Sequence, residues 1–404
     1  MSESDTLTAA RSTSVSKGSQ KHRWISTAGA WLGIGTSPGA LLLGAGIAER
    51  YGGPIPLLSL AFSLFAMFMI LWFQGVIGLP PPIGEGKNLT AIAPLYIGPT
   101  MQRILGAVIA MGMIGWFGFN IGLGAAALGA LVSIPQWAAS LLLGLPILGL
   151  ALMGIRSWNW LAGLTTISVL VLVAIVVVRL AARSTPITLQ SGSPSNTVAD
   201  VAVFVGYISV FSLRTPDFTY RLGNRKDLFT SILLLTSPLL VIALAGVSLQ
   251  QGTGSADLIS ILASPGGLAI GNLLITTSVI APTFTTFYSG APGLRAAVGL
   301  AEKPAMIAIG MIGLILALAR FDLWLLSWLS VLGATLPPLV VPLAVEGTRR
   351  RLSYPPRIVP IWVWLPGSLI AVALTLLQQP LAPLVGLITA AVLSGAWLFI
   401  NKLG

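Results

Sequence analysis

Long apolar stretches recur along almost the whole chain, and this feature constrains the fold more than any other. They cover residues 24–47, 57–78, 101–126, 135–154, 159–180, 200–220, 228–250, 268–290, 300–319, 322–345, 360–378 and 381–400. Each is close to the ~20 residues that an α-helix needs to cross a bilayer. Only 8% of the chain is charged, whereas a soluble domain has about 25%. We therefore predict an all-α integral membrane protein with twelve transmembrane helices.

The composition excludes several other classes of protein. A transmembrane β-barrel would show alternating segments of about ten residues, whereas continuous apolar runs dominate here. The chain has no cysteine and a single histidine, His22, which excludes disulfides, iron–sulfur clusters and multi-histidine metal sites. We accordingly expect no catalytic residue, no metal and no cofactor.

The N-terminal segment and the basic residues predict the orientation. Residues 1–23 are rich in Ser and Thr and lack the apolar core of a signal peptide, which predicts a disordered tail. Of the 22 Lys and Arg, those in loops lie on the side of the N-terminus, apart from Arg50, Arg179, Arg183 and Arg320. The positive-inside rule then places both termini in the cytoplasm of a multi-pass plasma-membrane protein. The net charge of +11 reflects basic residues beside anionic lipid, not binding of nucleic acid.

Two of the stretches contain residues that interrupt helices. Residues 33–39 include three glycines and a proline, and residues 206–218 include Gly, Ser and Pro. Irregular backbone in mid-membrane is tolerated only where it lines a cavity or is buried in protein, so helices 1 and 6 are predicted to be discontinuous. They stand five helices apart and cross in opposite directions, which indicates inverted five-helix repeats. The alternative is that Gly and Pro are common in membrane helices.

This symmetry predicts the organisation of the chain. The first repeat would cover residues 24–180 with helices 1–5, and the second would cover 200–345 with helices 6–10. Residues 346–404 would form two peripheral helices. The ends of the broken helices would offer backbone dipoles to a polar substrate, at Gly35, Thr36 and Ser37 in helix 1 and at Ser209 in helix 6.

The third helix carries a candidate site for a planar ligand. Trp116 and Asn120 are four residues apart and share one helical face. An indole and a carboxamide suit stacking and hydrogen bonding of a heterocycle, and Tyr207 could supply a second aromatic wall. The alternative is that all three residues serve helix packing.

The eighth helix and one arginine are further candidates. The helix is rich in hydroxyl groups, which would either line a path or bond to their own helix: Thr276, Thr277, Ser278, Thr283, Thr285 and Thr286. Of these, Thr283 is a candidate substrate-binding residue. Arg214 is the one basic residue that lies more than three residues inside a stretch, which marks it for function, unless it pairs with Asp217 or extends to the interface.

Several motifs in order resemble one family of transporters. They are Gly115-Trp116-Phe117-Gly118, residues 215–221 (TPDFTYR), residues 328–334 (WLSVLGA) with Pro337-Pro338 and Arg349-Arg350-Arg351 after them, and Leu43-Gly44-Ala45-Gly46. Together they resemble the nucleobase–cation symporter-1 family, whose bacterial members carry cytosine, purines, pyrimidines and hydantoins across the inner membrane. The resemblance covers nearly the whole membrane part.

The resemblance implies a LeuT-type fold that works by alternating access. It implies that Trp116 stacks the substrate, that Asn120 hydrogen-bonds it and that Tyr207 closes the other face. Where members bind sodium, the ion would lie between helix 1, near Gly29 and Leu32, and helix 8. There the matching positions are Ser278, Ala281 and Pro282, and the family's paired hydroxyl groups are missing.

We therefore expect a secondary transporter that imports a nucleobase-like heterocycle such as cytosine, with Na⁺ or H⁺ as the coupling ion. A thiamine-precursor pyrimidine, a hydantoin or an amino acid is the alternative cargo on the same fold, and a membrane-embedded enzyme is the remote alternative. The expected partners are the substrate and membrane lipids, with the chain acting as a monomer.

Overall fold

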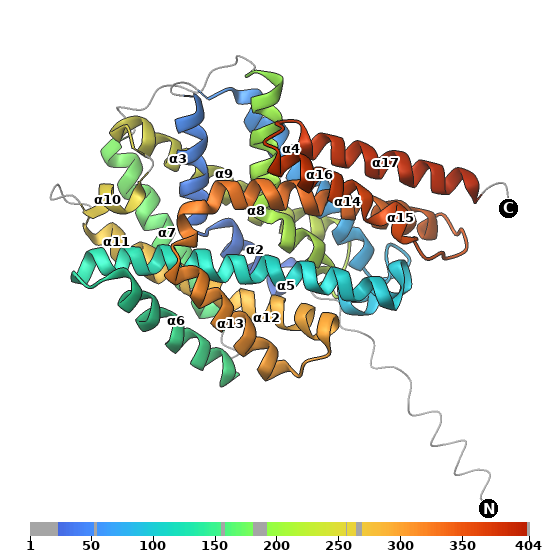
Figure 1. The fold of residues 1–404 in the computed structure, drawn as a ribbon, viewed down its shortest axis with the longest axis horizontal. Coiled ribbons are helices and arrows are strands. Elements are labelled where there is room, and N and C mark those ends of the chain that lie inside the picture. Colours follow the sequence, from blue (N-terminus) through green and yellow to red (C-terminus); the bar gives the residue numbers. More distant parts are fainter. Residues whose placement is uncertain are drawn as a thin grey trace, which may run out of the picture.

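The computed structural model describes residues 23–51, 55–154, 158–180, 192–255, 257–263 and 269–401, and within these ranges it consists of helices and the loops that join them (Figure 1). The elements are η1 (Trp24–Ser26), α2 (Ala28–Gly35), α3 (Gly39–Tyr51), α4 (Leu57–Gly78), α5 (Leu89–Val132), α6 (Gln136–Leu152), α7 (Trp158–Leu180), α8 (Pro194–Thr219), α9 (Arg225–Thr253), α10 (Leu258–Ala263), α11 (Ala269–Ser278), α12 (Ile280–Val298), α13 (Glu302–Leu318), η3 (Phe321–Trp324), α14 (Leu325–Arg351), α15 (Ile361–Trp364), α16 (Pro366–Leu376) and α17 (Ala382–Ile400). The predicted tail at 1–23, apart from Arg23, lies outside the described residues, and so does Arg183.

The helices follow the apolar stretches of the sequence. Among the described residues, eight helical segments are long and apolar enough to cross a membrane, and shorter apolar helices lie at Gln136–Leu152, Gly163–Val178 and Ile361–Leu376. The predicted all-α membrane fold is confirmed. The number of twelve spanning helices stays a prediction.

The first apolar stretch is broken, as predicted. α2 ends before residues 36–38, and α3 begins after them. Pro38 lacks the amide hydrogen that would continue a helix. Gly35 is required at the break because a Cβ atom there would overlap the backbone of Leu235 in α9. The break therefore packs closely against α9.

The predicted break in helix 6 is wrong, because α8 runs without interruption from Pro194 to Thr219. Polar side chains at the predicted break form hydrogen bonds within the helix, as the Ser209 hydroxyl donates to the carbonyl of Gly206 at 2.7 Å. Gly206 allows close packing, since a Cβ atom there would overlap the carbonyl of Leu329 in α14. Pro216 lies in the last turn of α8, where it cannot donate to the carbonyl of Ser212 but leaves the helix continuous.

A sharp turn divides α5 into two helices. Gly98 has φ 77° and ψ 163°, a conformation that glycine adopts readily. Residues 89–97 form a short helix, referred to below as the 89–97 helix, and residues 99–132 form the long third span. Leu89 and Tyr96 on the short helix are buried, so this helix packs against the body of the protein.

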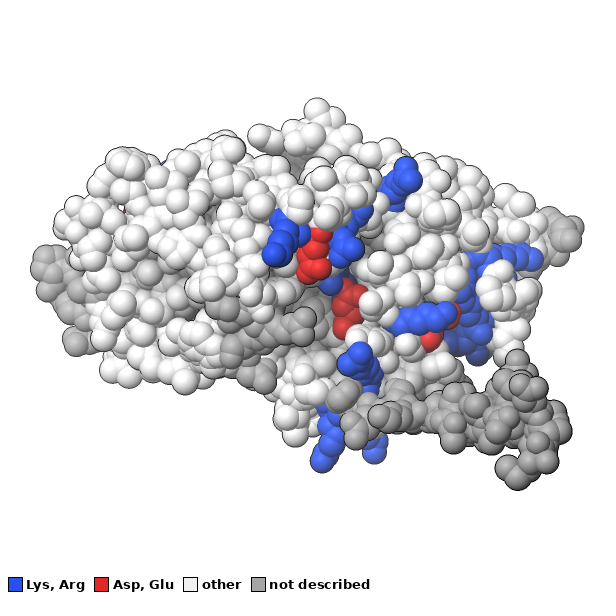
Figure 2. Space-filling view, turned by 90° about the horizontal axis from the view of Figure 1, so that it is seen from below, with Lys and Arg blue, Asp and Glu red and all other residues white. Residues whose placement is uncertain are grey.

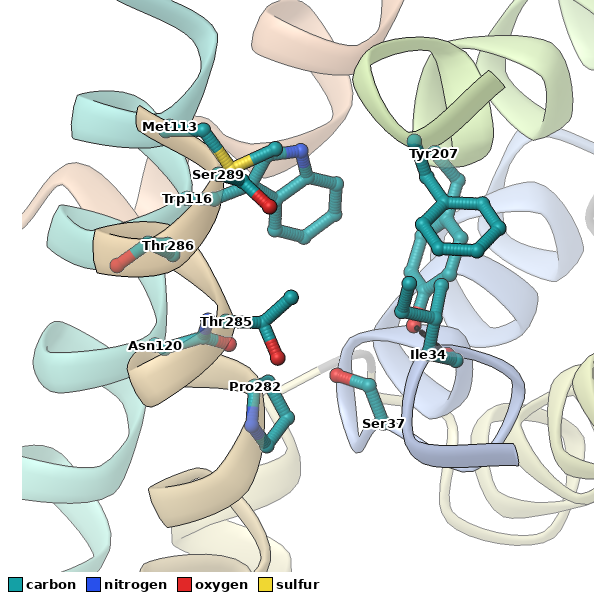
Figure 3. A pocket seen from close by; sticks show the side chains of 11 residues that line it. Ile34, Ser37, Met113, Trp116, Asn120, Tyr207, Pro282, Thr285, Thr286 and Ser289 are labelled. Atoms are coloured by element: carbon teal, nitrogen blue, oxygen red, sulfur yellow. Dashed lines mark hydrogen bonds between the residues drawn. The ribbon is translucent and has the colours of Figure 1, made fainter. Parts of the chain in front are cut away.

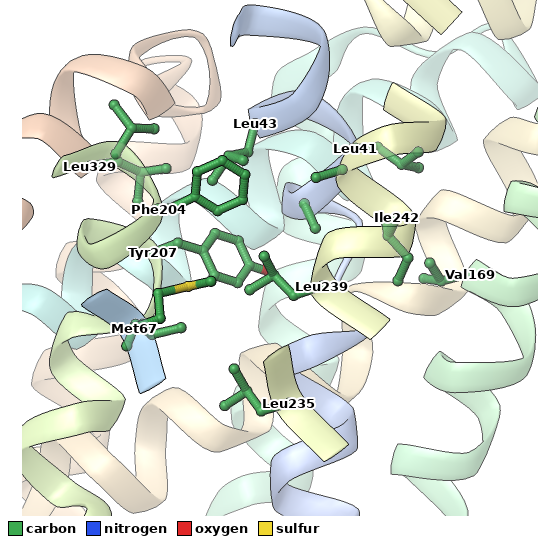
Figure 4. Packing of buried hydrophobic residues seen from close by; sticks show 14 of the residues in the cluster. Leu41, Leu43, Met67, Val169, Phe204, Tyr207, Leu235, Leu239, Ile242 and Leu329 are labelled. Atoms are coloured by element: carbon green, nitrogen blue, oxygen red, sulfur yellow. The ribbon is translucent and has the colours of Figure 1, made fainter. Parts of the chain in front are cut away.

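The central helices pack into two groups. The first helix group consists of α2, α3, α4, α8 and α9, and the second consists of α5, α6, α11, α12 and α13. Figure 4 shows the core of the first group, where Leu43 of α3 lies beside Phe204 of α8 and Leu41 lies on the side of Ile242 of α9. Small residues let the backbones meet, since a Cβ atom at Gly246 would overlap the carbonyl of Leu41.

The remaining helices cover the two groups. α14 packs against α8, and α15, α16 and α17 pack with α14 at one edge of the molecule (Figure 1). The division of the chain into two repeats and two peripheral helices after residue 346 stays a prediction. α7 packs against α2, α9 and α11, so it contacts both groups.

The basic residues are unevenly distributed over the surface. On the face shown in Figure 2, Lys and Arg gather over one half, and the other half is without them. Such an asymmetry is typical of a protein inserted across a membrane in one orientation. The cytoplasmic placement of the termini stays a prediction.

Candidate functional site

A pocket of about 480 Å³ lies between the two helix groups, beside the break in helix 1 (Figure 3). Its lining comes from both groups: Ile34, Ser37, Tyr207 and Phe211 from the first, and Met113, Trp116, Asn120, Pro282, Thr285, Thr286 and Ser289 from the second. This volume includes space that is open to the surroundings, and the internal cavity volume is about 50 Å³. A ligand in this pocket would contact both helix groups at once.

Each lining helix presents one face to the pocket. On α5 this face carries Met113, Trp116 and Asn120 at intervals of three and four residues. The sequence prediction that Trp116 and Asn120 share a face is therefore met by the structure. α8 contributes Tyr207 and Phe211 at the same helical spacing.

Two polar atoms in the pocket have no partner. Asn120 and Ser37 are 1% and 4% exposed, and neither the Oδ1 atom of Asn120 nor the Oγ atom of Ser37 has a hydrogen-bond partner among the described residues. Figure 3 shows both side chains directed at the open space from opposite sides. Because most buried polar atoms in proteins are hydrogen-bonded, these two are available to a polar ligand or to water in the pocket.

The aromatic wall differs from the one that the sequence suggested. The rings of Trp116 and Tyr207 contact each other edge to face, with centroids 5.2 Å apart and planes at 83°. A flat ligand stacked between two parallel rings needs them about 7 Å apart, so the predicted sandwich is wrong for this conformation. Tyr207 is held in place because its hydroxyl donates to the carbonyl of Ile34 at 3.2 Å. Trp116 is left as the surface on which a ring can stack.

The pocket is uncharged. The part of its lining that the structure describes contains no Asp, Glu, Lys, Arg or His. Backbone amides at the helix break already donate hydrogen bonds. The N–H of Thr36 donates to the carbonyl of Leu32 at 2.8 Å, and the N–H of Ser37 donates to the carbonyl of Ile34 at 3.3 Å. The break therefore does not present a cluster of bare amides to a carboxylate.

Four predicted substrate-binding residues lie outside this lining. The hydroxyl of Thr36 donates to the carbonyl of Leu32 at 2.7 Å, and that of Thr283 donates to Val279 at 2.6 Å. Ser209 bonds within α8, and Gly35 packs against α9, as described above. These residues shape the walls without facing the pocket.

The residues predicted for a cation site do not form a cage of oxygen atoms. The carbonyl of Leu32 already accepts two hydrogen bonds from Thr36. The hydroxyl of Ser278 donates to Ile275 at 2.8 Å, and Ala281 and Pro282 have no side-chain oxygen. Because proline cannot donate, the carbonyl of Ser278 lacks its helical partner, but a single carbonyl is a poor cation site. Gly29, one turn before Leu32, adds no side chain.

Several lining residues were missed from the sequence. Phe211, Met113, Thr285, Thr286 and Ser289 were not assigned to the substrate site, and Pro282 was assigned to the cation site instead. The positions 282, 285, 286 and 289 follow the spacing of one helical face, so this signal was present. Thr285 and Thr286 both line the pocket, and their hydroxyl groups donate to carbonyls of α12 at 3.1 and 2.6 Å.

A broken first helix, two helix groups and a pocket between them define the LeuT-type transporter fold, as the sequence predicted. The structure of Mhp1, a nucleobase-cation-symport-1 family transporter in a closed conformation with bromovinylhydantoin bound, has this fold: it matches with a TM-score of 0.70 and 16% identity, over 95% of this chain and 94% of that one. The inward-facing conformation of Mhp1 matches with a TM-score of 0.68 and 16% identity, over 96% and 94% of the two chains.

A more distant match has the same fold. The substrate-bound outward-open state of a Na⁺-coupled sialic acid symporter matches with a TM-score of 0.60 and 10% identity, over 94% of this chain and 90% of that one. No family model matches the sequence, and no curated protein matches it. The resemblance to the nucleobase–cation symporter-1 family is thereby confirmed as a likeness of fold.

Proposed function

We propose that this protein is a secondary transporter that carries a neutral, planar heterocycle by alternating access. The observation that carries the proposal is the pair of unpaired polar atoms, Asn120 Oδ1 and Ser37 Oγ, in one uncharged pocket. They belong to different helix groups, so a substrate that bonds to both would join the two groups. Rocking of one group against the other around this site would open it to each side of the membrane in turn.

The chemistry of the pocket supports a heterocycle with adjacent N–H and C=O groups. The Asn120 carboxamide offers one acceptor and two donors, and the indole of Trp116 offers an apolar face for stacking. Nucleobases, related pyrimidines and hydantoins all have this pattern, and the Mhp1 structure contains a bound hydantoin. The uncharged lining favours such a substrate over an amino acid, whose carboxylate would need a positive or amide-rich partner.

The coupling ion and the oligomeric state are further parts of this proposal. Coupling to Na⁺ or H⁺ stays a prediction, because the positions expected to hold sodium do not supply enough oxygen ligands. One chain contains the whole pocket, which supports a transporter that works as a monomer among membrane lipids. An enzyme would need a nucleophile with a base beside it, and the described lining offers hydroxyl groups without a base.

The proposal is tested by measuring binding with purified protein. Bound ligand raises the melting temperature by mass action, so we expect a shift with one or more nucleobases, pyrimidines or hydantoins and none with amino acids. The Trp116→Ala variant should lose this shift and the uptake of the same compound into proteoliposomes. Trp137→Ala is the matched control, because Trp137 is 60% exposed on α6 and lies outside the pocket. Normal affinity in Trp116→Ala would show that the pocket is wrongly assigned.

A further inference from the structure

A second cavity lies next to the substrate pocket, towards the predicted cytoplasmic side. It has an internal volume of about 30 Å³ and shares Ser289 of α12 with the first pocket. Its polar lining includes Thr90, Gln102, Arg214 and Asp217. Arg214 lies seven residues beyond Tyr207 on α8, which is about 10 Å along the helix axis. The two cavities therefore follow one another along the route from the substrate pocket to the predicted cytoplasmic side.

The only basic residue more than three residues inside a predicted span, Arg214, lies in this second cavity, and it is paired. The guanidinium of Arg214 contacts the carboxylate of Asp217 at 2.5 Å, and it also donates to the backbone carbonyl of Tyr288 in α12 at 3.0 Å. The other carboxylate oxygen of Asp217 accepts the backbone N–H of Leu89 at 2.7 Å. Arg214 and Asp217 are on α8, whereas Tyr288 and Leu89 are on α12 and the 89–97 helix. The bond to Tyr288 therefore joins the first helix group to the second, and the bond to Leu89 joins α8 to the 89–97 helix.

The location makes these bonds strong. The side chains of Arg214 and Asp217 are only 12% and 14% exposed, and hydrogen bonds to charged groups are stronger than neutral ones where water is largely excluded. A different ion pair shows the contrast. Arg50 and Asp200 lie 2.5 Å apart at the other end of α8, but they join α3 to α8, which belong to the same group.

We propose that Arg214 and Asp217 form a latch that closes the route between the substrate pocket and the cytoplasm. The latch holds α8 against α12 and the 89–97 helix, and release of substrate to the cytoplasm requires the bonds to Tyr288 and Leu89 to break. This inference rests on the proposed function, because it assigns the latch a step in the same transport cycle. Arg214 and Asp217 are positioning residues, since they contact the helices that must separate and not the substrate pocket itself.

The absence of native cysteine allows a direct test, because one introduced cysteine is then the only thiol in the chain. Ser289→Cys places this thiol where the two cavities meet. In inside-out vesicles, a membrane-impermeant maleimide reaches it only through the second cavity. We expect slow labelling of Ser289→Cys alone. Adding Arg214→Gln or Asp217→Asn should accelerate labelling, on the order of tenfold.

A matched control removes a different ion pair on the same side. Arg295 of α12 and Glu302 lie 3.7 Å apart and are 49% and 61% exposed, so Arg295→Gln should leave the labelling rate unchanged. Asp217→Asn keeps the side-chain shape but removes the charge that pairs with Arg214 and strengthens the bond from Leu89, so it decides the test if Arg214→Gln does not fold. A folded Asp217→Asn protein that labels no faster than Ser289→Cys alone would overturn the latch.

The test does not depend on the identity of the substrate. Labelling needs no ligand, so a failed binding screen with accelerated labelling would reject the proposed substrate class and keep the latch. Ligand binding with unchanged labelling would keep the transporter and reject the latch.

Discussion

The role of Asn120 can be decided by one substitution whose effects on stability and on binding have different signs. Asn120→Leu keeps the branching at Cγ and removes the amide. The Oδ1 atom of Asn120 is buried without a hydrogen-bond partner among the residues that the structure describes. An unpaired buried polar atom destabilises the ligand-free protein, so its removal should leave the free energy of unfolding unchanged or raise it by about 1 kcal/mol.

Binding should change in the opposite direction. If the substrate hydrogen-bonds to Asn120, its loss weakens binding by about 1–3 kcal/mol, which is roughly a 5- to 150-fold increase in Kd. A leucine of similar shape retains the apolar contact and cannot replace the hydrogen bond. The expected result is therefore a protein that is as stable as the wild type without ligand and that binds its substrate much more weakly.

The measurement is the melting temperature of purified protein over a range of ligand concentrations, which gives both quantities. Asn272→Leu is the matched control, since Asn272 of α11 is also 1% exposed with an unpaired Oδ1 and lies outside the pocket. The control should keep both its stability and its Kd. If Asn120→Leu lowers the melting temperature and leaves Kd unchanged, then Asn120 is a packing residue and the reasoning about the pocket is refuted.

Three further predictions concern the walls, the backbone contacts and the coupling ion. Thr285→Val should weaken substrate binding because Thr285 lines the pocket. Thr283→Val should leave binding unchanged, since the Thr283 hydroxyl is buried outside the pocket and donates to the carbonyl of Val279. Measuring Kd for both variants checks this prediction. Gly246→Ala should destabilise the protein by about 1–3 kcal/mol because its Cβ atom would overlap the carbonyl of Leu41, whereas Gly395→Ala, with open space around it, should not; melting temperatures check this pair. Replacing Na⁺ by choline should leave the ligand-induced melting shift unchanged, and a shift that requires Na⁺ would contradict our account of the cation positions.

The fold could be predicted from the sequence because it depends on local properties of the chain. The apolar stretches have the length of a bilayer crossing, and residues 33–39 cannot form a regular helix. The continuity of helix 6 could not be predicted, because glycine and serine residues occur both at helix breaks and at close contacts between helices. Only the position of Leu329 shows that Gly206 serves a contact.

The site was predictable to the extent that helical spacing defines a face. Trp116 and Asn120 share the face that lines the pocket, as their spacing indicated. Thr285 and Ser289 have similar spacing, but the sequence does not show which face of α12 turns inwards. The edge-to-face contact of Trp116 with Tyr207 depends on side-chain rotamers and neighbours, which a sequence does not specify.

Pro282 makes the pocket wall formed by α12 easier to bend. Because it cannot donate to the carbonyl of Ser278, one backbone hydrogen bond of the helix is missing where α11 passes into α12 at Val279. Bending at this level breaks no hydrogen bond between those two residues. The junction between α11 and α12 can therefore act as a hinge. The part of the wall that bears Thr285 and Ser289 can tilt there while α11 stays packed against α7.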